Sequence, residues 1–178
     1  MEETKEGGVR RLTIGEVELA KSVFGTTIQY DKIWIHKESY LPFNLQAELY
    51  AMTPNGEIYL RTTLYRDDFS LVVDDMQHLF IHEIGHIWQR EKGMNVIVRG
   101  LASLLVSYRY KLDGRLLSEY PMEQQAQVIA DNFILQKFGY KAWYFLWAKK
   151  DPSVTLDGDI SESIIRPQYK KSLRGFPW

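Results

Sequence analysis

The stretch LVVDDMQHLFIHEIGHIWQRE, residues 71–91, carries the pattern His-Glu-x-x-His at its centre. Apolar residues recur along it at helical spacing, which predicts one amphipathic helix. Residues four apart lie on one face of a helix, so His82 and His86 can offer two imidazole nitrogens to one metal ion. Glu83, one position further on, can reach a water bound to that metal. The pattern predicts the active helix of a zinc-dependent hydrolase.

The predicted helix has two separate faces. The apolar residues gather on one side: Val73, Met76, Phe80, Ile84, Ile87 and Trp88. His78, His82 and His86 gather on another. His78, one turn before His82, could line the same cleft, but we interpret it as a helix-surface or supporting histidine. Asp74 and Asp75 suit the positive end of the helix dipole, and Gly93 ends the helix. One face therefore packs while the other holds metal.

The length and composition predict one domain. The chain has 178 residues, of which 45% are hydrophobic and 13% aromatic, enough for one core. We expect a flexible leader over residues 1–12 and a single domain over residues 13–178. The net charge of −1 gives no reason to expect nucleic acid or an anionic membrane as a partner.

The chain has no cysteine, which excludes disulfides and thiolate metal sites. Zinc would have to be held by histidine and carboxylate. The N-terminus is polar and acidic, without the apolar segment of a Sec signal, and no stretch is apolar enough to span a membrane. We expect a protein made in the cytoplasm, with a non-Sec export route left open.

The residues before the active helix predict a short helix and a small sheet. Thr13 and Glu16 form the pattern of a helix capping box, and Gly25 suits the end of that helix. Residues 33–36 are β-branched and aromatic, which predicts a strand. Residues 47–52 and 57–63 flank the turn Thr-Pro-Asn-Gly, which predicts a hairpin. We expect a small antiparallel sheet packed on the active helix.

The residues after the active helix predict a helical subdomain. Residues 96–110 are apolar enough for a buried helix. Pro121 opens a second helix that Gly139 ends, and residues 140–149 predict a short aromatic helix. Residues 153–178 look like a turn-rich tail. The expected fold class is α+β and zincin-like, with the sheet, the active helix and a C-terminal helical subdomain.

A third metal ligand must come from outside the active helix. Glu123 is our candidate, because it lies in the first turn of a predicted helix whose small residues Ala126 and Ala130 would allow close approach to the active helix. A solvated first-turn glutamate would look the same. Glu119 and Asp131 are the alternatives.

The remaining catalytic roles follow from this arrangement. Glu83 would act as general base, taking a proton from the metal-bound water and giving it to the leaving amine. A second donor would stabilise the oxyanion. The candidates, among which the sequence does not choose, are His36, Tyr59, Tyr65 and Tyr120.

Six runs of the chain resemble small Vgr-related bacterial proteins associated with Rhs and type VI secretion elements. They are TIGE (13–16), AKSVFG (20–25), YDKIWIH (30–36), MTPNGEIY (52–59), LFIHEIGHIWQ (79–89) and EYPMEQQA (119–126). The resemblance implies a gluzincin-like metallopeptidase, either a toxic effector or a processing factor, with secretion-apparatus and immunity proteins as partners. It supports Glu123 as a ligand. Gln127 departs from many gluzincins, which have an acidic residue four positions after the ligand glutamate.

Three hypotheses remain. The first is a zinc metallopeptidase that hydrolyses a protein or peptide substrate and is linked to a secretion system. The second is a catalytically silent zincin-fold adaptor of a secretion assembly, which the presence of Glu83 argues against. The third is a zinc hydrolase of another bond, such as a cell-wall amide.

Overall fold

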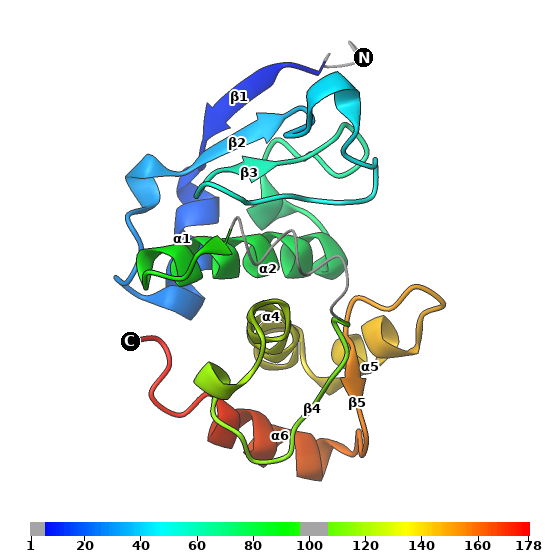
Figure 1. The fold of residues 1–178 in the computed structure, drawn as a ribbon. Coiled ribbons are helices and arrows are strands. Elements are labelled where there is room, and N and C mark those ends of the chain that lie inside the picture. The colour runs from blue at the N-terminus through cyan, green and yellow to red at the C-terminus, as the bar shows by residue number, and fades with distance from the viewer. Residues whose placement is uncertain (1–5, 97–106) are drawn as a thin grey trace.

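The computed structural model describes residues 6–96 and 107–178. Figure 1 shows a three-stranded sheet at one end, α1 and α2 beneath it, and α4 with the C-terminal elements at the other end. The fold is mixed α and β, as predicted. None of the helices in the described ranges is long and apolar enough to cross a membrane.

The sheet contains strands β1 (Gly8–Arg11), β2 (Trp34–Lys37) and β3 (Ile58–Tyr59), in the order β1-β2-β3. The expected strand at residues 33–36 is β2. The predicted leader is wrong for residues 8–11, because β1 pairs antiparallel with β2 along its whole length. The Arg11 guanidinium lies 3.9 Å from the centre of the Trp34 ring, which helps to hold this strand in the sheet.

The expected antiparallel hairpin is also largely wrong. β3 has two residues and pairs parallel with β2, while the antiparallel partner is reduced to one bridge between Met52 and Tyr59. The side-chain amide of Gln46 donates to the carbonyls of Tyr50 and Tyr59 at 2.7 and 3.0 Å. The Tyr59 carbonyl also accepts from the Met52 amide at 3.1 Å, so the Gln46 side chain joins the single bridge to the residues before it. Gly56 has φ +87°, as its predicted place in a turn requires.

Helix α1 (Ile14–Phe24) begins with the predicted capping box. The Thr13 hydroxyl accepts from the Glu16 amide at 3.1 Å, and the Glu16 carboxylate accepts from the Thr13 amide at 2.9 Å. Glu16 is fully buried, and it also accepts two hydrogen bonds from the Arg10 guanidinium at 2.8 Å. The cap thus ties α1 to β1.

The two longest helices of the described residues are α2 (Asp74–Glu91) and α4 (Met122–Phe138), and they lie side by side (Figure 1). Their close approach depends on small residues, as expected for Ala126. A Cβ atom added at Gly85 would lie 3.3 Å from the Ala126 Cβ, tighter than nearly all real contacts. This packing brings residues of α2 and α4 into one site.

The C-terminal half contains β4 (Tyr110–Lys111), α5 (Tyr140–Ala148), β5 (Leu156–Asp157) and α6 (Glu162–Ser172). The prediction of a turn-rich tail is wrong, because α6 buries Ile165 and Tyr169 in the core. Pro167 makes the sequence pattern unfavourable for a helix, but α6 continues through this residue. The helix expected at residues 96–110 falls mostly on residues 97–106, outside the described ranges, and Tyr110 lies in β4.

Four single 3₁₀ turns complete the described structure. They are η1 (Tyr30–Lys32), η2 (Pro42–Asn44), η3 (Phe69–Leu71) and η4 (Leu117–Glu119). The segment with η3 leads directly into α2 and stacks Phe69 on Phe80 of that helix, with ring centres 5.4 Å apart. This contact fixes the start of α2 against the core.

Candidate metal centre

The structure brings together the three predicted metal ligands. His82 and His86 lie on successive turns of α2, and Glu123 lies in the first turn of α4. The Glu123 Oε2 atom is 3.3 Å from His82 Nε2 and 3.2 Å from His86 Nε2. Within residues 6–96 and 107–178, this is the one group of three His, Asp or Glu side chains with donor atoms close enough to hold a metal ion.

The distances fit a tetrahedral zinc ion. Nitrogen and oxygen ligands lie about 2.0–2.1 Å from zinc, so two ligand atoms of a tetrahedral site are about 3.3–3.4 Å apart. Both contacts of Glu123 lie close to this value, and all three donor atoms lie within 4.8 Å of one another. A donor set of two imidazoles and one carboxylate leaves the fourth position of a tetrahedral ion open. The residues present therefore fit a catalytic zinc site.

Gln89 orients His86 within this group. The Nδ1 atom of His86 lies 2.9 Å from Gln89 Oε1, which can only accept, so Nδ1 donates in this contact and Nε2 is the ring nitrogen that faces Glu123. The Gln89 amide in turn donates to the Met122 carbonyl at 2.8 Å and to Gln125 at 3.1 Å. Gln89 is fully buried, so this orientation is fixed by the α2–α4 interface.

The electrostatics of the centre favour a cation. Burial works to lower the pKa of His86, but Glu123, Glu83 and the hydrogen bond to Gln89 outweigh it and raise that pKa to about 9. Burial works to raise the pKa of Glu123, and the two histidines hold it well below its usual range. A carboxylate that stays ionised while buried provides the negative charge that a divalent metal needs.

Glu83 is held in place by Thr53, which the sequence analysis did not single out. The Thr53 hydroxyl donates to Glu83 Oε2 at 2.5 Å, and both side chains are buried. Thr53 follows the Met52 bridge to Tyr59, so the sheet positions it above α2. This hydrogen bond fixes one oxygen of Glu83.

Tyr108 is a second residue that the sequence analysis missed, because its segment was interpreted as a buried helix. Its ring centre lies 5.9 Å from that of His82. Burial, followed by the charges of Glu123 and Glu83, raises the pKa of Tyr108 well above its usual range. Its hydroxyl therefore stays protonated and can donate a hydrogen bond.

The predicted oxyanion donors are engaged elsewhere. The Tyr65 hydroxyl accepts from Arg10, and the Tyr120 hydroxyl donates to the Lys111 carbonyl at 2.7 Å. His36 and Tyr59 stack on each other beside Glu57. In the part of the chain that the structure describes, none of these four residues belongs to the group of His82, His86 and Glu123.

The alternative third ligands also have other roles. Glu119 accepts from the Leu116 amide at 2.7 Å and caps η4. Asp131 lies 2.7 Å from His78 Nε2 and accepts from the Tyr110 hydroxyl and the Gln127 amide at 2.7 and 2.9 Å. His78 of α2 thus contacts Asp131 of α4 and supports the packing of the two helices. This agrees with the interpretation of His78 as a supporting residue. Gln127, which stands where many gluzincins have an acidic residue, belongs to this network through its hydrogen bond to Asp131. His86 is instead oriented by Gln89.

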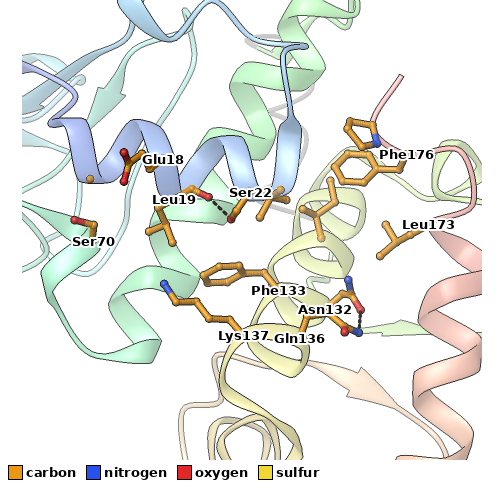
Figure 2. A pocket seen from close by; sticks show the side chains of 14 residues that line it. Glu18, Leu19, Ser22, Ser70, Asn132, Phe133, Gln136, Lys137, Leu173 and Phe176 are labelled. Atoms are coloured by element: carbon orange, nitrogen blue, oxygen red, sulfur yellow. Dashed lines mark hydrogen bonds between the residues drawn. The ribbon is translucent and has the colours of Figure 1, made fainter.

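A pocket of about 850 Å³ lies away from the metal centre, between α1, α4 and the last residues of the chain (Figure 2). Leu19 of α1 and Phe133 of α4 are among its apolar residues. It is lined by no histidine, and the charged Lys137 at its edge donates to Gln77 at 3.0 Å. His82, His86 and Glu123 are not among the described residues that line this pocket.

Two comparisons with known proteins, one of sequences and one of solved structures, found similarity to the same protein. No family model matches the chain. The solved effector domain of Pseudomonas aeruginosa VgrG2b superposes with a TM-score of 0.66 and 34% identity, over 88% of this chain and 87% of that domain. The chain belongs to the VgrG2b effector-domain family. The type VI secretion system spike protein VgrG2b of the same organism is 39% identical over 133 residues, which are 70% of this chain and 13% of the spike protein. The match thus covers a small part of that protein.

Proposed function

We propose that this chain is a zinc-dependent metallopeptidase of the zincin type that acts as a type VI secretion effector. The observation that carries the proposal is the buried group of His82, His86 and Glu123 next to Glu83. Two histidines and one carboxylate with a neighbouring glutamate are the donor set and base that peptide hydrolysis at zinc requires.

The side chains of this site have separate roles in the proposed mechanism. Zinc, when bound, supplies Lewis-acid chemistry that polarises the scissile carbonyl and makes water more acidic. The Glu83 carboxylate accepts the proton of the attacking water and passes it to the leaving amine. Thr53 holds that carboxylate in one orientation. The Tyr108 hydroxyl, beside His82, donates to the oxygen on which negative charge develops.

The effector assignment rests on family membership. The relatives are an effector domain and the spike protein that contains it. We infer that the chain is likewise delivered by a type VI secretion system, a non-Sec route, to act on a protein or peptide substrate in a target cell. Components of the secretion apparatus and an immunity protein are the partners that this role requires.

A catalytically silent adaptor is less consistent with the site. A binding module needs no general base, yet Glu83 is buried beside the metal ligands and held by a hydrogen bond from Thr53. Burying an ionisable group costs free energy unless it is paired. Retaining this arrangement without a chemical use would bring no benefit to an adaptor.

Metal analysis of the purified protein tests the proposed centre. We expect about one zinc per chain, lost in His82→Ala, His86→Ala and Glu123→Ala. Glu119→Ala is the matched control, because Glu119 is a nearby first-turn carboxylate outside the cluster, and it should keep the zinc. Retention of full zinc in Glu123→Ala would overturn Glu123 as the third ligand.

A further inference from the structure

One loop of the structure exposes an unusual set of large apolar side chains. In residues 40–50, here called the 40–50 loop, the exposed fractions are 93% for Phe43, 68% for Leu45, 73% for Leu49 and 57% for Tyr50. Single exposed apolar residues are common on protein surfaces, but several in one short segment usually mark an interaction site.

The loop is held in one conformation by buried polar groups. Gln46 is 2% exposed; its side chain accepts from the Tyr40 amide at 2.8 Å and donates to the Tyr50 carbonyl at 2.7 Å. Arg61 donates to the carbonyls of Asn44 and Gln46 at 3.2 and 2.5 Å. These contacts hold the backbone from beneath and leave the apolar side chains facing outward.

The loop backbone is also strained at its tip. Phe43 and Asn44 both have φ near +56°, a conformation that is unfavourable for residues other than glycine. Such positions cost on the order of 1 kcal/mol each and persist where surrounding contacts impose them. The fold thus maintains a strained loop that presents Phe43 to solvent.

The loop leads directly into the metal centre. Thr53, whose hydroxyl binds Glu83, follows Tyr50 by three residues, a span of at most about 11 Å. Tyr50 is among the groups that raise the pKa of Tyr108, after burial, Glu123 and Glu83, and the Tyr108 ring lies beside His82. The loop therefore ends three residues before a residue that contacts Glu83.

We propose that the 40–50 loop is a substrate subsite that binds a bulky apolar side chain of the polypeptide near the scissile bond. This inference rests on the proposed peptidase function. The side chain of Glu48 in the loop is paired with Arg61 at 2.7 Å, so the contact surface offered is mainly apolar. The acidic side chain of Glu38, next to the loop, is 43% exposed, which disfavours insertion into an anionic membrane.

Cleavage-site mapping tests the subsite. The zinc-loaded protein is incubated with an unfolded-protein digest, and cut positions are identified by mass spectrometry. Two synthetic peptides, differing by Leu or Ser at the preferred position, then give a ratio of kcat/KM. We expect the double variant Leu45→Ser/Leu49→Ser to lower this ratio about tenfold, since one apolar contact discriminates by roughly 10–200-fold. Phe145→Ser, at a residue 65% exposed on α5, should leave it unchanged.

Binding measured without turnover separates this inference from the proposed function. In the Glu83→Gln background, fluorescence anisotropy should show that a labelled apolar peptide binds more weakly once Leu45 and Leu49 are serine. An unchanged kcat/KM ratio together with unchanged peptide binding would overturn the subsite, even if the enzyme cleaves peptides. Loss of lipid-vesicle binding with no change in peptide preference would overturn it in favour of a membrane contact. Absence of cleavage by the wild type, with peptide binding intact, would instead overturn the peptidase.

Discussion

Thr53 and Gln89 hold two of the side chains to which the proposed mechanism assigns a role, Glu83 and His86. Thr53 donates to Glu83, and Gln89 accepts from His86. Each contact fixes a side chain that would otherwise rotate, which is how supporting residues tune metal sites and bases.

Replacing Thr53 should affect turnover without affecting metal binding. Thr53→Val removes a hydrogen bond to a charged group, worth about 1.5–3 kcal/mol, so we expect kcat to fall at least about tenfold. Thr53→Ser keeps the hydroxyl and should restore most of the activity. Steady-state kinetics with zinc analysis checks this. Equal kcat for Val and Ser variants would show that the hydrogen bond has no catalytic role.

Replacing Gln89 should weaken zinc binding. Gln89→Leu leaves His86 Nδ1 without its acceptor, and loss of such partners typically costs about 10–100-fold in metal affinity. Gln89→Glu keeps an acceptor at that position and should lose less. A competition titration with a chelator measures both variants. If Leu and Glu variants bind zinc equally well, Gln89 only fills space.

At the residue scale, the sequence predicted the groups that are close in the chain or carry a recognisable pattern. His82, Glu83 and His86 follow from helical periodicity, and Glu123 from its place in the first turn of a helix with small neighbours. Thr53 lies thirty residues from Glu83, and only the folded sheet brings them together. No local signal distinguishes it from any other turn threonine.

At the scale of elements, the α2–α4 contact assembles the metal centre. Gly85 and Ala126 allow the helices to approach closely, and the ligands lie within one turn of that contact. Asp131 reinforces it from α4 by accepting from Tyr110 of β4 and Thr155 next to β5, at 2.7 and 3.1 Å. A single buried carboxylate thus joins several elements around the site.

Widening the helix contact should disturb both stability and metal binding. Gly85→Val adds side-chain atoms where a Cβ alone lies 3.3 Å from the Ala126 Cβ. We expect the free energy of unfolding to fall by about 1–3 kcal/mol and the zinc affinity to fall with it. Denaturant unfolding and zinc titration measure these changes. Ala126→Gly in the same chain restores the space, so additive losses in the double variant would contradict the packing account.

The helices were predicted more accurately than the sheet, for a physical reason. The capping box of α1 and the periodicity of α2 are local, so the sequence alone identifies them. The short β3 depends on Gln46 and Arg61, which bind backbone carbonyls from distant parts of the chain. The sequence did not predict α6, because Pro167 disfavours a helix locally. Burial of Tyr169 in the core stabilises this helix in the folded protein.

At the scale of the whole molecule, α2 and α4, which carry the candidate metal ligands, lie where the sheet-bearing half meets the C-terminal half (Figure 1). The sheet side supplies Thr53 and the 40–50 loop, α2 supplies His82, Glu83 and His86, and α4 supplies Glu123. A site assembled from both halves requires that they fold together. The single domain predicted for residues 13–178 remains a prediction, and β1 extends the folded part back to at least Gly8.

The comparison of wild type with Glu83→Ala, both loaded with zinc, tests the central claim most directly. Glu83 is not a ligand, so we expect both proteins to bind about one zinc per chain and to unfold at similar denaturant concentrations. Mass spectrometry of a peptide digest should show new cuts with the wild type and a loss of about a hundredfold or more in Glu83→Ala. Equal cutting by zinc-loaded Glu83→Ala and wild type would contradict the account.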